Sequence, residues 1–420
     1  MTSTELAPVA DDMSAFIIAG AVSSNPERYE RETEGRTPAQ GVQDGVDAEA
    51  LGYRRVWLSE RWDIKQADVI LSAIGARTTR LEIGTGIVVP STRHAWSTAA
   101  LGATFHAVHG ERFILGLGRG EKGAFKGMGI KVTTFEAMAD YIDIYRRLWA
   151  GEAVNYDGPA GRFEHLKFAE TYEGRPPEIW LAGFAHEAGA QLLAESGLDG
   201  VILPPIVTPV MVAAAKERIR VACERVDRDP SEIRIVVPVV TAPDMEEVEA
   251  MSISAGRLVT YLQYPYYGDA LATANGWDLG PVNEMRNHPQ FQGLTRAADL
   301  TFHRHEMLGP ASLLPQEWIF DSCAIGTVDE CVTNLARFID AGADEIATYG
   351  STPRQNAKLI AAWRERKRET ERCAIARRAT AACVPPRMPG WENAASNPDT
   401  PRPKSLPPRS SSSTETPEPS

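Results

Sequence analysis

The segment LEIGTGIVVPSTRHAWSTAALGATFHAVHGERFILGLGRGE, residues 81–121, decides the fold. It opens with a β-branched run, Leu81–Val89, and closes with a second, Arg112–Leu117, that leads into a glycine-rich stretch. Between them a helical pattern runs from about Ala95 to Val108. A strand, a helix and another strand in this order indicate two parallel strands joined by a crossover helix.

The same alternation continues along the chain and predicts eight strands, each followed by a helix. The expected strands are Phe16–Val22, Arg55–Ser59, Leu81–Val89, Arg112–Leu117, Glu178–Ala182, Gly200–Leu203, Ile233–Thr241 and Glu345–Tyr349. Eight is the number that closes a barrel without leaving an edge, so we expect a (β/α)8 TIM barrel. A doubly wound open sheet is the alternative, because alternation alone does not require closure.

Capping signals predict several helix boundaries. Gly52 ends the helix Pro38–Leu51. Thr133 precedes Glu136 by three residues, which is a capping box for a helix that ends near Trp149. A second capping box, Thr327-x-x-Glu330, begins a helix that runs to Asp340, and a last helix follows from about Gln355.

Three segments interrupt this rhythm or lie outside it. A small hairpin is expected over Gly151–Phe168, and a largely helical, aromatic-rich insertion follows the seventh strand at about residues 244–322. The tail ends in SSSSTETPEPS, a composition that buries too little apolar surface to offset the entropy of ordering. We therefore expect a flexible N-terminus over 1–14, a barrel over 15–372 and a disordered Pro/Ser-rich tail over 373–420.

Charge and cysteine content indicate a cytoplasmic protein that acts on a small molecule. The net charge of −12 argues against a nucleic-acid partner. The five cysteines are scattered and form no C-x-x-C pair, which is typical of a reducing compartment. No basic signal-peptide region and no membrane-length apolar run occur, and a homodimer is possible. The pairs His106/His109 and His303/His305 lack acidic or sulfur co-ligands, so we expect no metal.

The glycines after the fourth strand allow two interpretations. Gly118, Gly120 and Gly123 spell G-x-G-x-x-G, but a Rossmann fingerprint requires the helix to begin within the pattern, and the sequence predicts it only after Thr133. In a barrel, such a loop lies at the mouth and lets backbone N–H groups approach a flat or anionic ligand. Glu121 would lie there too; a plain flexible loop is the alternative.

Four ordered motifs resemble the luciferase-like family of flavin and deazaflavin enzymes. They are LEIGTGIVVPSTRH (81–94), HGERFILGLGRGE (109–121), the run from RRLWAGEAVNYDG to PPEIWLAGF (146–184), and AGADEIATYG (341–350). The resemblance covers most of Phe16–Tyr349 except the insertion. It implies a barrel oxidoreductase whose cofactor is coenzyme F420 or, alternatively, FMN.

The resemblance also implies residue roles. A cis peptide at Gly86–Ile87 would back the central ring of the cofactor. The G-x-G-E loop resembles the F420 branch, in which Arg119 and Gly120 would line the cofactor and Glu121 could donate a proton. The backbone of Ala182, Gly183 and Phe184, just before a helix, would hold the cofactor phosphate, because a helix N-terminus offers free N–H groups.

One departure puts the acid–base group in doubt. After the second strand the family often has an acidic residue followed by histidine, whereas this sequence reads Glu60-Arg61. Arginine cannot exchange a proton near neutral pH. Either Glu60 or Glu121 takes that role, or Arg61 binds an anionic group of the substrate. His94 and Tyr264, the latter in the aromatic cluster of the insertion, are further candidates for substrate binding.

The resulting hypothesis is an oxidoreductase that transfers a hydride between coenzyme F420 and a small organic substrate. One alternative is an FMN-dependent monooxygenase, which acts on paired donors with O2. A non-catalytic flavin-binding protein is the alternative of another class, and Arg61 gives it some support.

Overall fold

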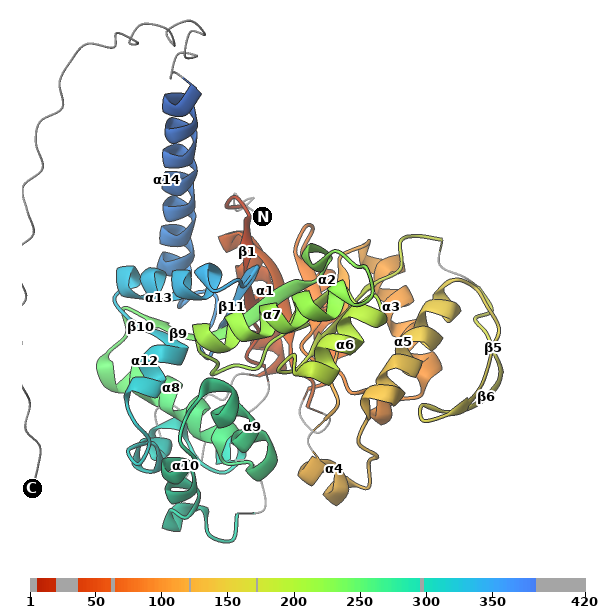
Figure 1. The fold of residues 1–420 in the computed structure, drawn as a ribbon, viewed down its shortest axis with the longest axis horizontal. Coiled ribbons are helices and arrows are strands. Elements are labelled where there is room, and N and C mark those ends of the chain that lie inside the picture. The colour runs from red at the N-terminus through yellow and green to blue at the C-terminus, as the bar shows by residue number, and fades with distance from the viewer. Residues whose placement is uncertain are drawn as a thin grey trace, which may run out of the picture. The chain divides into compact units, whose positions relative to one another are not determined.

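The computed structural model describes residues 6–19, 37–61, 65–120, 122–170, 173–294 and 298–382 (Figure 1). Glu121, residues 20–22 of the first predicted strand and residues 383–420 of the predicted tail lie outside these ranges.

Eight parallel strands close into a barrel, which confirms the TIM barrel and excludes the open sheet. They are β1 (Ala10–Phe16), β2 (Tyr53–Leu58), β3 (Glu82–Thr85), β4 (Phe113–Leu117), β7 (Glu178–Ala182), β8 (Gly200–Ile202), β9 (Arg234–Pro243) and β11 (Glu345–Tyr349). Closure runs through β9, which pairs with β8 on one side and with β11 on the other. The pairing of β11 with β1, in register Met13 to Ile346, completes the ring.

The first strand begins earlier than predicted. β1 starts at Ala10, not Phe16, so the expectation of a flexible N-terminus over 1–14 is wrong for its second half. Asp12, within this strand, has partners on the last helix. Asp12 accepts a hydrogen bond from Trp363 Nε1 at 3.2 Å and pairs with Lys367 Nζ at 3.3 Å.

A further short strand, β10 (Cys323–Gly326), was not predicted. It pairs in parallel with the last residues of β9, from Val240 to Pro243, of which Val240 also pairs with Tyr349 of β11. Four residues are too few for a readable alternation of apolar and polar side chains.

The helices follow the strands as expected. They are α1 (Pro38–Leu51), α2 (Ala67–Gly75), α3 (Ala95–His109), α5 (Phe135–Trp149), α6 (Glu187–Glu195), α7 (Pro209–Glu224), α13 (Val328–Asp340) and α14 (Ala357–Ala382). Gly52 adopts the left-handed conformation that ends α1, and Thr327 forms the predicted capping box.

Two boundaries near the glycine-rich loop differ from prediction. The N-cap of α5 is Thr134, whose Oγ accepts from Ala137 N at 3.0 Å, and not Thr133. A short helix, α4 (Lys122–Met128), stands where a continuous loop was expected. The argument that no helix begins near the G-x-G-x-x-G pattern was therefore wrong, although the closed barrel still excludes a Rossmann fold.

The hairpin and the insertion are confirmed. β5 (Val154–Gly158) and β6 (Gly161–Leu166) pair antiparallel. The insertion contains α8 (Glu247–Leu262), α9 (Pro265–Asn275), α10 (Leu279–Arg286), α11 (Leu308–Ala311) and α12 (Glu317–Ser322), with short 3-10 turns at Pro289–Phe291, Ala298–Leu300 and Arg304–Met307. Figure 1 shows α8, α9 and α10 gathered at the same end of the strands as α4.

The last helix crosses a boundary between two compact units, of which the first ends at Lys367. Its first turns carry the buried residues Leu359, Ile360 and Trp363. Residues 368–382 belong to the second unit and are helical, so the predicted start of a disordered tail at residue 373 falls inside this helix.

Two tryptophans fill the inside of the barrel. Trp57 of β2 and Trp180 of β7 are fully buried, and their rings lie 5.3 Å apart. Glycines on two other strands make room for them. A Cβ on Gly84 would lie 2.5 Å from the Trp57 ring, and one on Gly200 would lie 2.5 Å from the Trp180 ring. The barrel is therefore a packed core with a solid interior.

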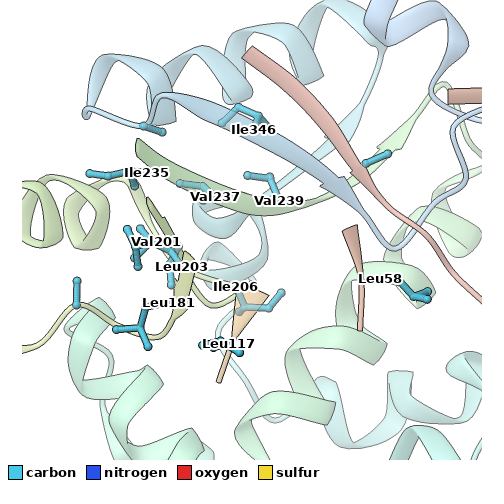
Figure 2. Packing of buried hydrophobic residues seen from close by; sticks show 14 of the residues in the cluster. Leu58, Leu117, Leu181, Val201, Leu203, Ile206, Ile235, Val237, Val239 and Ile346 are labelled. Carbon is cyan, nitrogen blue, oxygen red and sulfur yellow. The ribbon is translucent and has the colours of Figure 1, made fainter. Parts of the chain in front are cut away.

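The other face of each strand packs against the helices. Along β9, Ile235, Val237 and Val239 alternate with Val236, which belongs to the interior cluster with Trp57. Figure 2 shows these three β9 side chains beside Val201 and other apolar residues of the outer layer. Successive side chains of a strand point to opposite faces, so one strand serves both layers.

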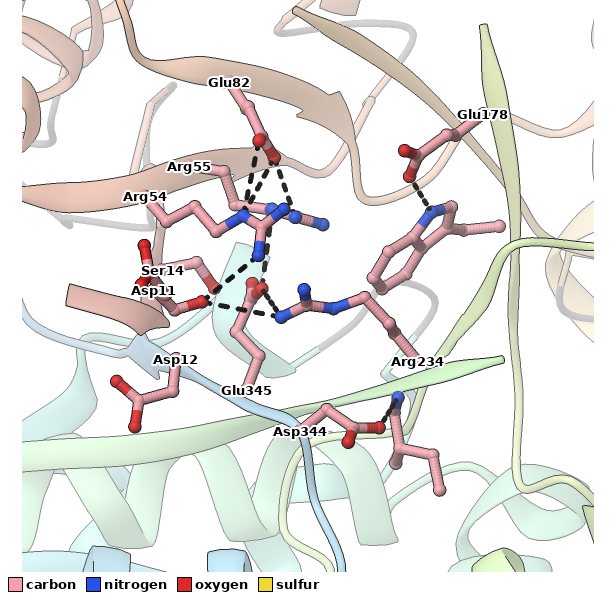
Figure 3. A network of polar contacts seen from close by, with 12 residues as sticks. Asp11, Asp12, Ser14, Arg54, Arg55, Glu82, Glu178, Arg234, Asp344 and Glu345 are labelled. Carbon is pink, nitrogen blue, oxygen red and sulfur yellow. Dashed lines mark hydrogen bonds and ion pairs between the residues drawn. The ribbon is translucent and has the colours of Figure 1, made fainter. Parts of the chain in front are cut away.

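A charged network surrounds Arg55, which is buried with its guanidinium 4.9 Å from the centre of the Trp180 ring (Figure 3). Its Nη2 pairs with Glu82 at 2.7 Å, and its Nε lies 3.5 Å from Glu345, which is fully buried. Arg234 reaches the same Glu345 oxygen at 3.5 Å.

Candidate active site

A cavity of about 220 Å³ opens at the carboxyl end of the barrel strands, where TIM-barrel enzymes place their active sites. Its lining comes from the end of β1, the segment after β2, the end of β11 and the insertion. The lining residues are Phe16, Ile17, Ile18, Ala19, Ser59, Arg61, Lys65, Arg257, Thr260, Tyr261, Tyr264, Asp299 and Tyr349.

One face of α8, extended to the start of α9, supplies the lid side of the cavity. Arg257, Thr260, Tyr261 and Tyr264 follow the spacing i, i+3, i+4 and i+7 of a single helical face. Tyr264, and Tyr261 as part of the same aromatic cluster, were singled out from the sequence, whereas Arg257 and Thr260 were not. The spacing, with an arginine beside the aromatic cluster, was a readable signal that the sequence analysis missed.

The charged lining residues are mostly cationic. Arg61 Nη1 lies 3.5 Å from Asp299 Oδ2, and Arg257 Nη1 lies 3.7 Å from the same oxygen. Within the described part of the chain, the Lys65 amine has no hydrogen bond or ion pair. Burial, together with the positive charges of Arg61 and Arg257, lowers the pKa of Lys65 to about 7. Lys65 can therefore hold or release a proton near neutral pH.

Tyrosines form the aromatic wall. The hydroxyls of Tyr261 and Tyr349 lie 3.0 Å apart in a hydrogen bond, and the Arg257 guanidinium lies 4.9 Å from the centre of the Tyr349 ring. Burial raises the pKa of Tyr261, so it remains a neutral phenol near neutral pH. Phe16 packs edge-on against Tyr349 at 5.5 Å.

The Gly86–Ile87 peptide bond is cis, as the resemblance implied. Ser59 Oγ, which lines the cavity, donates to the Gly86 carbonyl at 2.6 Å, and Glu60 N donates to the Ile87 carbonyl at 3.3 Å. A Cβ on Gly86 would lie 2.7 Å from the Phe16 ring. This bond is thus connected to the cavity wall through Ser59.

Among the described residues predicted for the site, only Arg61 and Tyr264 line the cavity, and the proposed cofactor-binding residues lie outside its lining. Glu60 and His94, predicted for catalysis and substrate binding, also do not line it. Glu60 is buried and paired with Arg93, and the same oxygen accepts from Ala67 N at 3.3 Å. His94 is exposed at the N-cap of α3, with its ring 5.1 Å from that of Phe163 in the hairpin. The structure brings Arg61 and Tyr264 together and leaves these two outside.

The glycine-rich loop after β4 is anchored through Arg119. Its Nε donates to the Thr133 carbonyl at 2.9 Å, and its guanidinium lies 4.1 Å from the centre of the Phe135 ring. Gly120 is exposed with φ +79°, and a Cβ there would collide with the Phe125 ring at 2.3 Å. Glu121, the next residue, is outside the described ranges.

The segment before α6 offers space and positive charge. A Cβ on Gly183 would meet no atom within 4 Å, although its N–H already donates to the Ile202 carbonyl at 3.0 Å. His186, the N-cap of α6, makes no side-chain capping bond. Arg218 donates from Nε to the Ala185 carbonyl at 2.6 Å, which fixes a cation near the helix start.

Comparison with known proteins assigns the family. The family model described as luciferase-like monooxygenase matches residues 19–345. The chain belongs to the luciferase-like monooxygenase family. It is 28% identical over 323 residues to a 5,10-methylenetetrahydromethanopterin reductase of Methanolobus tindarius, covering 74% of this chain and 91% of that protein.

Several solved structures share the fold of this chain. The coenzyme F420-dependent tetrahydromethanopterin reductase of Methanopyrus kandleri matches with a TM-score of 0.66 at 17% identity, over 84% of this chain and 97% of that one. A type II Baeyer–Villiger monooxygenase of Pseudomonas putida, in complex with FMN, matches with a TM-score of 0.57 at 16% identity, over 84% and 98%. Both cofactors therefore occur among proteins that share this barrel.

Two searches concern other kinds of site. No helix within the described ranges is long and apolar enough to cross a membrane. Among the same residues, no group of three or more histidine, cysteine, aspartate or glutamate side chains could hold a metal ion.

Proposed function

We propose that this member of the family transfers a hydride between coenzyme F420 and a small organic substrate. The cavity at the barrel mouth carries the proposal, because it adjoins the Gly86–Ile87 bond through Ser59 and contains a proton-exchanging group, Lys65. The likeness to an F420-dependent reductase and to a methylenetetrahydromethanopterin reductase supports F420 as the cofactor.

The residues present fit a flat cofactor with an anionic tail. Ile87, Ala182 and Tyr349 are half-buried and pack on the interior cluster that contains both tryptophans, which supplies an apolar floor. The open space at Gly183, beside the start of α6, suits a phosphate, because helix N-termini attract anions. Arg119 and Gly120 are proposed to line the cofactor from the β4 side.

Coenzyme F420, when bound, supplies the hydride acceptor or donor, and the protein supplies orientation and electrostatics. Arg61 and Tyr264 would orient the substrate from opposite sides of the cavity. Lys65 would hold or accept the substrate proton at Nζ. Glu121 stays a proposed proton donor, whereas Glu60, held by Arg93, is better placed to position the β2 loop.

Titrating the purified protein with F420 and with FMN, by calorimetry, tests this proposal. We expect F420 to bind and the Gly183→Leu variant to bind it at least about tenfold more weakly, because the added side chain fills the open space while displacing no neighbour. Gly309→Leu is the matched control, since a Cβ at Gly309 also meets nothing within 4 Å.

Binding of FMN alone would replace the proposal by an FMN-dependent monooxygenase, which the likeness to the FMN-bound structure favours. Binding of neither cofactor would contradict both. Cofactor binding without turnover of any substrate would leave a flavin-binding protein without catalytic activity.

A further inference from the structure

We infer that the substrate of the proposed oxidoreductase carries an oxyanion group, which binds between Arg61, Lys65 and Arg257 in the place that Asp299 occupies. This inference rests on the proposed function and names its substrate class. The group is a carboxylate or a phosphate ester at one end of an apolar body.

The cations come from two segments that are far apart in the sequence. Arg61 and Lys65 come from the segment after β2 and are joined by two backbone hydrogen bonds, Arg61 N to Lys65 O at 3.0 Å and Lys65 N to Arg61 O at 2.8 Å. Arg257 faces them from α8 of the insertion. Two residues joined through their backbones and one residue of a helix face thus place three positive groups around one small cavity.

Asp299 does not balance these charges. Both arginines reach a single oxygen, at 3.5 and 3.7 Å, whereas charge-assisted hydrogen bonds are about 2.7–2.9 Å long. The exposed fractions of the side chains are only 27% for Arg61, 17% for Arg257 and 14% for Asp299. Charges withdrawn from water need close partners. Three cations around one loosely held carboxylate indicate a site for a further anion.

The rest of the lining defines the body of the ligand. Phe16, Tyr261 and Tyr349 present rings, and Ile17 and Ile18 present aliphatic side chains. Burial and the neighbouring arginines lower the pKa of Lys65 to about 7, although the Asp299 carboxylate acts in the opposite direction. A compact apolar or aromatic acid matches both halves of the cavity.

Probes that share a fluorophenyl ring and differ in head group test the inference on the full chain. We would titrate 4-fluorobenzoate, the neutral 4-fluorobenzamide and 4-fluorophenyl phosphate, following the fluorine NMR signal, with and without saturating F420. The first and third probes distinguish a carboxylate from a phosphate ester. The variants are Arg257→Met and Asp299→Asn, with Arg162→Met on the hairpin, 71% exposed, as the control.

We expect at least one anionic probe to bind in the presence of F420, and the amide to bind at least about tenfold more weakly. Arg257→Met should weaken binding of the anionic probe at least about tenfold without changing binding of the amide probe. Asp299→Asn should strengthen binding of the anionic probe, because it removes the competing carboxylate. Arg162→Met should change neither.

Equal binding of the anionic and amide probes would overturn the inference, as would unchanged anion binding in both cavity variants. Loss of the anion signal on addition of F420 would also overturn it, because the cations would then hold the cofactor's own anionic tail. If the anion binds but F420 does not, the oxyanion site stands and the proposed function fails.

Discussion

Replacing Arg55 by methionine should destabilise the barrel by about 3 kcal/mol. Arg55 is 1% exposed and pairs with Glu82 at 2.7 Å and with the fully buried Glu345 at 3.5 Å. Methionine keeps most of the apolar volume of the arginine stem, so the variant mainly removes a charge from beneath the paired tryptophan rings.

The magnitude follows from what remains after the change. Removing one partner of a buried ion pair costs about 3–5 kcal/mol, because the other charge stays buried without compensation. Here Glu345 keeps Arg234 at 3.5 Å, and Glu82, 29% exposed, keeps Arg54. Both residual contacts place the expected cost at the lower end of that range.

The double variant Arg55→Met/Glu345→Met separates charge from packing. It buries no lone carboxylate, and replacing a whole buried pair by apolar residues is often close to neutral, so it should be more stable than Arg55→Met alone. The original pair is also incompletely satisfied, since Glu345 Oε1 and Arg55 Nη1 are buried without hydrogen-bond partners in the described structure.

Urea unfolding followed by tryptophan fluorescence and by circular dichroism measures these differences. Arg54→Met is the matched control, because Arg54 is 26% exposed and pairs with the same Glu82, so it should cost less than about 1 kcal/mol. An Arg55→Met protein as stable as wild type, or a double variant less stable than the single one, would refute the reasoning.

Three further predictions concern packing, capping and pH. Gly84→Ala should cost about 1–3 kcal/mol in urea unfolding, because its Cβ would lie 2.5 Å from the Trp57 ring; unchanged stability would disprove this packing. Thr134→Ala should lower the free energy of unfolding by about 1 kcal/mol, because it removes the N-cap of α5, and Thr133→Val should lower it clearly less. A larger loss for Thr133→Val than for Thr134→Ala would instead support Thr133 as the capping residue. Affinity for 4-fluorobenzoate should fall as pH rises through about 7, where the Lys65 amine with its lowered pKa loses its proton, and Lys65→Met should flatten that profile; a profile that survives the substitution would exclude Lys65 as its source.

The spacing of apolar residues predicted most of the barrel, because each strand or helix that it identified is longer than one repeat of its apolar pattern. The boundaries at Gly52 and Thr327 were also readable, since glycine in the left-handed conformation and a capping box are local features. The missed elements are β10 and α4, both short, and the start of β1 at Ala10.

The site was predicted less completely, for a physical reason. Motifs identified Gly86 and Ile87 at the cis bond, because strand positions and their glycines are tied to the core. Lys65, Arg257 and Asp299 meet only through the folded path of the chain, and no local pattern connects them. The presence of a residue in a sequence motif also does not specify where its side chain points in the folded protein. His94 belongs to the first motif but lies against the hairpin.

One wall of the substrate cavity comes from a helical face of α8, in the insertion, and not from the barrel strands. Arg257, Thr260 and Tyr261 lie within one helix of the insertion, whereas the tryptophan pair belongs to barrel strands and the cis bond directly follows β3. Exchanging residues 247–264 between relatives would therefore transplant one wall of the substrate cavity as a single block. The buried face of α8 also packs against β9 and β10, so an exchanged segment would have to match the barrel beneath it as well as a new substrate.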